Sequence, residues 1–281
     1  KRKSVFFIEY IGLWQRMLTG LVEIITAKHA GFCFGVQRAV QLAMDAARRY
    51  GKVYTLGSLI HNSREVERLQ QEGVVPVQRL QKVPEGGVVV IRSHGVAPEI
   101  LSVCEDRQLT VIDATCPFVS KAQKIAAELT QAGRPVIILG DKSHPEVIGI
   151  NGWSGGRAYV IANCEQAKAL PPLVKPGFLA QTTQQEETWE AVRQVLEARY
   201  PDLTCYHTIC ATTKSRQEEV RQMAKTVDCM IVIGGVDSAN TQKLKDICRS
   251  CGKPAFALES ADQLGPALFY KAARIGVAAG A

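Results

Sequence analysis

The 281-residue sequence lacks a continuous apolar run of the roughly 20 residues that a membrane-spanning helix needs. The apolar stretch near its beginning, KRKSVFFIEYIGLWQRMLTGLVE, is interrupted by Glu9, Gln15 and Arg16. We therefore expect no membrane partner. Residues 1–22 fit either a surface amphipathic helix or an upstream extension with no role, and we favour the extension.

Aromatic residues are also scarce, at 6% of the sequence, and they do not accompany the basic residues. The net charge of +7 is dispersed along the chain, which argues against a nucleic-acid partner and suits a small polyanion or an acidic protein partner equally well. Nine cysteines form an odd set, and no secretory cleavage pattern precedes them. We expect reduced thiols in a cytoplasmic protein.

From residue 23 onward, short apolar runs alternate with helical patterns. Such alternation is typical of α/β folds with mainly parallel sheets. The runs VYTL, VVVI, VIIL and MIVI contain almost no polar residue, which predicts strands buried on both faces. We predict three similar α/β domains over residues 23–107, 108–202 and 203–281.

A cysteine stands between a predicted strand and a predicted helix at three places: Cys33, Cys116 and Cys210. Each helix leads to a strand that ends in glycine, and the offsets 57 − 33, 140 − 116 and 234 − 210 all equal 24. An internal repeat explains this spacing better than chance does. Since ligands gather at the carboxyl ends of parallel strands, three repeats about a pseudo-threefold axis would bring the cysteines to one centre.

Three thiolates at helix N-termini would form a site for a soft metal, because the helix dipole favours the ionised thiol. A zinc ion would need a fourth ligand, such as a histidine. A [4Fe–4S] cluster held by three cysteines would keep one iron open to a ligand. A zinc- or thiol-dependent hydrolase and a non-enzymatic anion-binding module remain alternatives. The C-x-x-C pair of Cys248 and Cys251 is a weaker redox or metal candidate.

Polar residues stand after the predicted strands of each repeat and are expected to ring a cavity above the cysteines. They are His61, His94, His144, Glu146, Thr182, Ser238 and Asn240. Imidazole, hydroxyl and amide groups suit a phosphate or diphosphate. The sequence has no Walker loop and no G-x-G-x-x-G, so the anion need not be a nucleotide. Glu146 is the one carboxylate of the set and a natural proton donor.

Eight motifs, in order, resemble those of the 4-hydroxy-3-methylbut-2-enyl diphosphate reductase family of the non-mevalonate isoprenoid pathway. They are AGFCFGVQRAV, SLIHNSREV, RSHGV, DATCPFV, SHPEV, QTTQ, ATTKSRQ and DSANTQKL. The resemblance covers about residues 23–281. It implies a trefoil of three α/β domains around a [4Fe–4S] cluster, with Cys33, Cys116 and Cys210 as the ligands.

The resemblance further implies an oxidoreductase that converts (E)-4-hydroxy-3-methylbut-2-enyl diphosphate to isopentenyl and dimethylallyl diphosphates by reductive dehydroxylation. Ferredoxin or flavodoxin would supply the electrons, and Glu146 would act as the acid. The substrate would face the three histidines of the set together with Thr182, Ser238 and Asn240.

Two positions depart from the family pattern. Ala239 stands where many relatives have a second serine, and the pattern continues beyond Ala281 with a serine that holds the diphosphate. We therefore expect the third domain to be shortened at its end and the chain as given to bind the diphosphate weakly.

Overall fold

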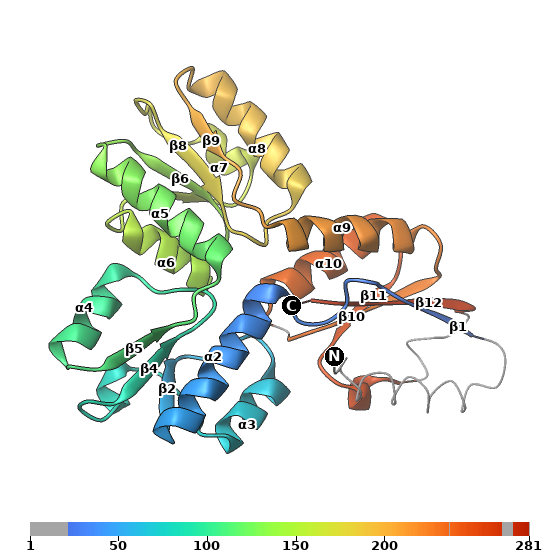
Figure 1. Cartoon of the computed structure of the whole chain (residues 1–281). Coiled ribbons are helices and arrows are strands. Elements are labelled where there is room, and N and C mark those ends of the chain that lie inside the picture. Colours follow the sequence, from blue (N-terminus) through green and yellow to red (C-terminus); the bar gives the residue numbers. More distant parts are fainter. Residues whose placement is uncertain (1–21, 236, 266–271, 281) are drawn as a thin grey trace. The chain divides into compact units, whose positions relative to one another are not determined.

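The computed structural model describes residues 22–235, 237–265 and 272–280. In this part of the chain, twelve strands form three parallel four-stranded sheets with helices between successive strands (Figure 1). The predicted α/β class with parallel sheets is confirmed. Residues 1–21 of the predicted extension and Ala281 lie outside the described residues.

The first sheet has the strand order β3-β2-β4-β5. Its strands are β2 (Val53–Leu56), β3 (Val74–Val77), β4 (Val88–Ile91) and β5 (Thr110–Asp113). The helices that connect them are α2 (Phe34–Tyr50), which leads into β2, α3 (Ser63–Gln71), η1 (Leu80–Lys82) and α4 (Pro98–Asp106).

The second sheet has the order β7-β6-β8-β9. Its strands are β6 (Val136–Leu139), β7 (Tyr159–Ile161), β8 (Gly177–Ala180) and β9 (Thr204–Tyr206). Its helices are α5 (Pro117–Gln131), α6 (Pro145–Trp153), α7 (Cys164–Lys168) and α8 (Glu186–Arg199).

The third sheet, ordered β1-β12-β10-β11, joins the two ends of the described chain. Its strands are β1 (Glu23–Thr26), β10 (Cys229–Ile233), β11 (Ala255–Leu258) and β12 (Arg274–Ala279), and its helices are α9 (Ala211–Ala224), α10 (Ala239–Ser250) and η2 (Ala261–Gln263). The blue β1 lies beside the red β12 in Figure 1, with Ile24 in register with Ile275.

All three sheets share one topology, which gives the sequence repeat a structural counterpart. In each sheet the strand after the repeat cysteine's helix is β2, β6 or β10. It lies between the next two strands of the chain, and a fourth strand forms the outer edge beyond one of them. That fourth strand is β5, β9 or β1, the strand that directly precedes Cys116, Cys210 or Cys33. Each cysteine therefore lies in the connection between one sheet's edge strand and the helix that leads into another sheet.

The predicted domain boundaries, after residues 107 and 202, fall just before β5 and β9. Both strands pair with the sheet that precedes them in the chain. The described residues form two compact units. One unit contains residues 34–60 and 64–213, with the first and second sheets, and the other contains residues up to 33, 61–63 and 214 onward, with the third sheet.

The predicted buried strands are present, and most are enclosed on both faces. Every residue of β4 and β6 is buried, as expected for apolar strands in a parallel sheet. The VYTL strand, β2, differs because its buried residues alternate with the partly buried Tyr54 and Leu56. Those two side chains pack at the margin of a small cluster around Leu80 and Val83, which covers that face incompletely.

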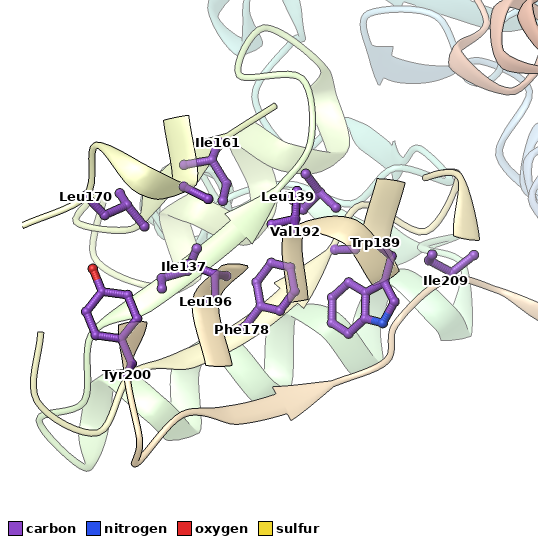
Figure 2. Close-up of a cluster of buried hydrophobic side chains, with 12 residues drawn as sticks. Ile137, Leu139, Ile161, Leu170, Phe178, Trp189, Val192, Leu196, Tyr200 and Ile209 are labelled. Carbon is purple, nitrogen blue, oxygen red and sulfur yellow. The ribbon is translucent and has the colours of Figure 1, made fainter. Parts of the chain in front are cut away.

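The core of the second sheet fixes the strands that carry much of the candidate site (Figure 2). Phe178 of β8 stacks on Trp189 of α8 with ring centroids 4.2 Å apart. Such a pair contributes about 0.5–1.5 kcal/mol beyond the burial of its area. Ile209, the residue before Cys210, belongs to the same buried cluster. No helix in the described part of the chain is long and apolar enough to cross a membrane.

Candidate functional site

His144 and Glu146 lie at the start of α6, after the carboxyl end of β6. His144 is the N-cap residue, and its ring nitrogen Nδ1 accepts a hydrogen bond from the Glu146 main-chain N–H at 3.2 Å. Because Nδ1 is the acceptor, a neutral His144 ring carries its proton on Nε2. The helix cap thus makes Nε2 a hydrogen-bond donor that can serve an anionic ligand.

Glu146 is buried and is held at both carboxylate oxygens by Thr182, which follows β8. Oε1 accepts from the Thr182 main-chain N–H at 2.6 Å, and Oε2 lies 2.9 Å from Thr182 Oγ1. A main-chain N–H can only donate, so Oε1 is an acceptor whether or not the carboxyl is protonated. Oε2 accepts from the Thr182 hydroxyl, so the two hydrogen bonds together fix the orientation of the Glu146 carboxyl group.

The turn after β6 is held by Gln181, a fully buried residue that sequence reasoning missed. Its Oε1 accepts from the Asp141 main-chain N–H at 3.1 Å, and its Nε2 donates to Thr183 Oγ1 at 3.1 Å. Gly140 fits under this turn because a Cβ there would lie 2.7 Å from a methyl group of Val147. The turn is thereby packed against the helix that carries Glu146.

His94 follows β4 and belongs to the same compact unit as His144. The two imidazole rings lie edge to face, with centroids 5.4 Å apart. This unit therefore brings together His94, His144, Glu146 and Thr182, four of the residues predicted from the sequence.

Each repeat cysteine directly precedes a helix, as predicted. Cys116 is the N-cap residue of α5, Cys33 precedes α2, and Cys210 precedes α9. All three are reduced and partly exposed. The main chains of two of them, Cys116 and Cys210, are hydrogen-bonded in the same way to the end of a neighbouring strand. The N–H of Cys116 donates to the Ser93 carbonyl at 2.9 Å, and that of Cys210 donates to the Thr182 carbonyl at 3.0 Å.

Thr182 therefore links two functional groups directly, since its N–H and hydroxyl bind Glu146 while its carbonyl binds Cys210. Ser93, the equivalent partner of Cys116, is the residue before His94. In each case the strand end that carries a predicted polar residue also holds a cysteine.

Four of the other cysteines have thiols whose pKa is raised by burial. Burial, with smaller contributions from the thiols of Cys251 and Cys229, raises the pKa of Cys248 to about 12. Burial also raises the pKa of the Cys104, Cys205 and Cys229 thiols. Their thiols are therefore protonated at neutral pH, which fits packing rather than chemistry.

Two arginines hold the main chain before the cysteines, and sequence reasoning assigned them no role. Arg38 of α2 donates to the Thr115 carbonyl at 3.0 Å, one residue before Cys116. Arg216 of α9 donates to the His29 carbonyl at 3.0 Å and also to that of Gly31. Arg38 lies in the motif AGFCFGVQRAV and Arg216 in the motif ATTKSRQ. The motifs single out these residues, but the sequence does not indicate which carbonyl groups they bind.

The other compact unit holds Ser238 and Asn240 at the start of α10. Ser238 is the N-cap residue and accepts from the Thr241 N–H at 3.3 Å. Asn240 is only 5% exposed, and among the described residues its Oδ1 has no hydrogen-bond partner. Ala239, the position that departs from the family pattern, is the first residue of this helix.

His61 belongs to this second unit, within the segment 61–63. Its carbonyl packs so closely against Gly235, after β10, that a Cβ on Gly235 would collide with it. Ser63 donates to Glu259 at 2.8 Å, which fixes the segment beside the end of β11. His61, Ser238 and Asn240 are thus all placed by connections at the carboxyl edge of the third sheet.

Three parallel sheets of one topology, linked by cysteine-bearing connections and carrying polar side chains at their carboxyl edges, define the chain as an α/β protein. The family model described as "LytB protein" matches residues 24–281. The chain belongs to this family.

Similar proteins agree with this assignment. A protein of Geobacter sp. (strain M21) named 4-hydroxy-3-methylbut-2-enyl diphosphate reductase is 45% identical over 260 residues, which cover 92% of each chain. A protein of the same name from Caldanaerobacter subterraneus subsp. tengcongensis is 40% identical over 264 residues, again with 92% coverage of each. The family predicted from the motifs is confirmed.

Two solved structures share the fold. One is described as (E)-4-hydroxy-3-methyl-but-2-enyl diphosphate reductase, the terminal enzyme of the non-mevalonate pathway. It is 40% identical, with a TM-score of 0.67, and the match covers 92% of this chain and 94% of that one. The reductase from Plasmodium falciparum gives a TM-score of 0.89 at 24% identity, covering 92% of this chain and 83% of that one, and supports the fold alone.

Proposed function

We propose that this protein is an oxidoreductase that converts (E)-4-hydroxy-3-methylbut-2-enyl diphosphate to isopentenyl and dimethylallyl diphosphates. Family membership and relatives at 40–45% identity support the proposal. The observation that carries it is the buried Glu146–Thr182 pair, because reductive removal of a hydroxyl needs a positioned proton. The reaction replaces a C–O bond by a C–H bond, consumes two electrons and two protons, and releases water.

The cysteine set fits a [4Fe–4S] cluster. Cys33, Cys116 and Cys210 are reduced and partly exposed, and each stands at the start of a helix, where the dipole favours a thiolate ligand. A cluster held by these three residues would supply electrons and one iron that can act as a Lewis acid. The buried cysteines, with raised thiol pKa values, are poorer ligands.

In this proposal Glu146 is the acid. Its Oε2 lies 2.9 Å from Thr182 Oγ1, so a proton carried by Oε2 can reach a substrate oxygen either directly or through the Thr182 hydroxyl. The Thr182 N–H holds the other oxygen in place throughout, because it cannot accept a proton. His144 donates from Nε2 to an anionic oxygen, and His94, whose ring adjoins that of His144, extends the same polar surface.

Ser238 and Asn240 are proposed to bind the diphosphate, together with His61. Both lie at the N-terminus of the 12-residue helix α10, where main-chain N–H groups and the helix dipole attract anions. The oxygen and nitrogen of an asparagine amide can be exchanged by rotating the side chain. If the amide is rotated in this way, the nitrogen of Asn240 takes the buried position now assigned to Oδ1, and its N–H₂ group can donate to a phosphate oxygen.

Ferredoxin or flavodoxin is proposed as the electron donor, on the strength of the family resemblance. The proposed location is the cytoplasm, where nine reduced cysteines are stable.

Iron and sulfide analysis of anaerobically purified variants tests the proposal. We expect Cys33→Ser, Cys116→Ser and Cys210→Ser each to lose most of the bound iron and sulfide. The control is Cys248→Ala, which removes a buried thiol and is expected to keep wild-type iron content. Loss of iron in the control together with retention in Cys116→Ser would contradict the ligand assignment.

A further inference from the structure

Thr213, the third residue of α9, contacts the sulfur of Cys210 with two of its groups. Its hydroxyl oxygen lies 2.9 Å from Cys210 Sγ, and its main-chain N–H donates to the same sulfur at 3.3 Å. The side chain is only 3% exposed, so water does not compete for the hydroxyl. The main-chain bond is an ordinary helix cap, whereas the hydroxyl bond depends on the identity of this residue.

The other two repeats lack this hydroxyl. The third residue after Cys33 is Val36, and the third residue after Cys116 is Val119. Valine has the shape of threonine without the donor, so these positions can pack alike but cannot make the same bond. The repeat thus contains one chemical asymmetry directly beside its cysteines.

The main chain of Cys210 is fixed by contacts that do not involve Thr213. Ile209 is buried in the core of the second sheet, and the Cys210 N–H donates to the Thr182 carbonyl at 3.0 Å. With its main chain fixed in this way, the sulfur stays within reach of the Thr213 hydroxyl. A sulfur that is bound to a metal has no proton to donate, so in that state the threonine is the donor.

We propose that Thr213 is a positioning residue that raises the reduction potential of the group bound by Cys210 and makes this ligand inequivalent to Cys33 and Cys116. The inference rests on the proposed function. A hydrogen bond to a ligand sulfur stabilises the more negative, reduced state of an iron–sulfur cluster, and such bonds are among the factors that set its potential. A hydroxyl at the third position after Cys210, where the other two repeats have valine, would also distinguish this ligand from Cys33 and Cys116.

Potentiometric titration of the anaerobically prepared holoprotein tests the proposal. Thr213→Val preserves shape and the main-chain bond while removing the hydroxyl, so we expect full iron content and a lower reduction potential. Thr213→Ser restores a donor and should return the potential toward the wild-type value. The control is Thr212→Val, the same substitution one residue earlier, which should leave the potential unchanged.

The converse variant is Val119→Thr, which introduces a hydroxyl at the equivalent position after Cys116 and should raise the potential. A wild-type potential in Thr213→Val at full iron content would overturn the inference while leaving the proposed function intact. If Thr213→Val loses iron, its potential cannot be compared with that of the wild type, and Val119→Thr becomes the test. An unchanged reduction potential in Val119→Thr would then overturn the inference. A wild-type protein that binds no iron and sulfide would overturn both the inference and the proposed function.

Discussion

Replacing Glu146 by glutamine separates the proton of this residue from its structural role. Glutamine has the same length, so its carbonyl oxygen can still accept from the Thr182 N–H, as Oε1 does at 2.6 Å. Its amide nitrogen can donate to Thr182 Oγ1 in place of the 2.9 Å contact of Oε2. Both contacts are therefore kept, the second with Thr182 Oγ1 as the acceptor instead of the donor, and the transferable proton is lost.

The expected magnitudes follow from this geometry. Because no buried group loses its partner, the free energy of unfolding should change by less than about 1 kcal/mol. Loss of general acid catalysis should lower turnover roughly 10²-fold or more, which corresponds to about 2.7 kcal/mol of transition-state stabilisation. By contrast, Glu146→Ala would strand the buried Thr182 N–H and cost about 1–3 kcal/mol of stability.

A single-turnover experiment isolates this step from electron delivery. Pre-reduced protein is mixed anaerobically with excess (E)-4-hydroxy-3-methylbut-2-enyl diphosphate, and product is quantified over time, with substrate affinity measured separately. The matched control is Glu165→Gln, the same substitution at an exposed glutamate in the first turn of α7, which should retain the wild-type rate. A wild-type rate in Glu146→Gln would remove Glu146 from the mechanism.

Two further predictions concern the scaffold. Burial alone would raise the pKa of Glu219, but hydrogen bonds from the main-chain N–H groups of Lys28 and His29 and from the His29 ring hold it below its usual value. The ionised carboxylate therefore stabilises the fold above its unfolded-state pKa, and this contribution is lost as pH falls through the folded-state pKa. Urea unfolding from about pH 6 to about pH 3 should show the stability difference between wild type and Glu219→Gln shrinking toward acid; a constant difference would refute the linkage. Gly140→Ala should lower the free energy of unfolding by about 1–3 kcal/mol, since its Cβ would lie 2.7 Å from Val147. The control is Gly265→Ala, where no described atom lies within 4 Å of the added Cβ and no such loss is expected. Equal stabilities of the two variants would show that the turn at Gly140 relaxes to accept the methyl group.

Much of the fold could be predicted because its signals are local. The runs VVVI and VIIL are apolar throughout, and they form strands buried at every residue. Each repeat cysteine marks the start of a helix, and in α5 the following Pro117 fits the first turn because its missing N–H costs nothing there. The pairing of β1 with β12 could not be predicted in this way, because the two strands are about 250 residues apart and neither sequence specifies its partner.

The residues of the candidate site also fall into those that the sequence indicates and those that it does not. Glu146 and Thr182 were identified from their places at predicted strand and helix ends, and they proved to be hydrogen-bonded partners. Gln181, Arg216 and Thr213 act through bonds to a turn, to main-chain carbonyls and to a sulfur. Such contacts depend on tertiary placement, so the residue type alone does not indicate them.

The most direct test of the central claim is product analysis with the holoprotein. Anaerobically prepared wild-type protein, with its iron and sulfide content measured, is incubated with (E)-4-hydroxy-3-methylbut-2-enyl diphosphate and a low-potential reductant, and the products are identified by mass spectrometry and NMR. We expect reductant-dependent formation of isopentenyl and dimethylallyl diphosphates. Protein that holds iron and sulfide but leaves the substrate unchanged would contradict the account.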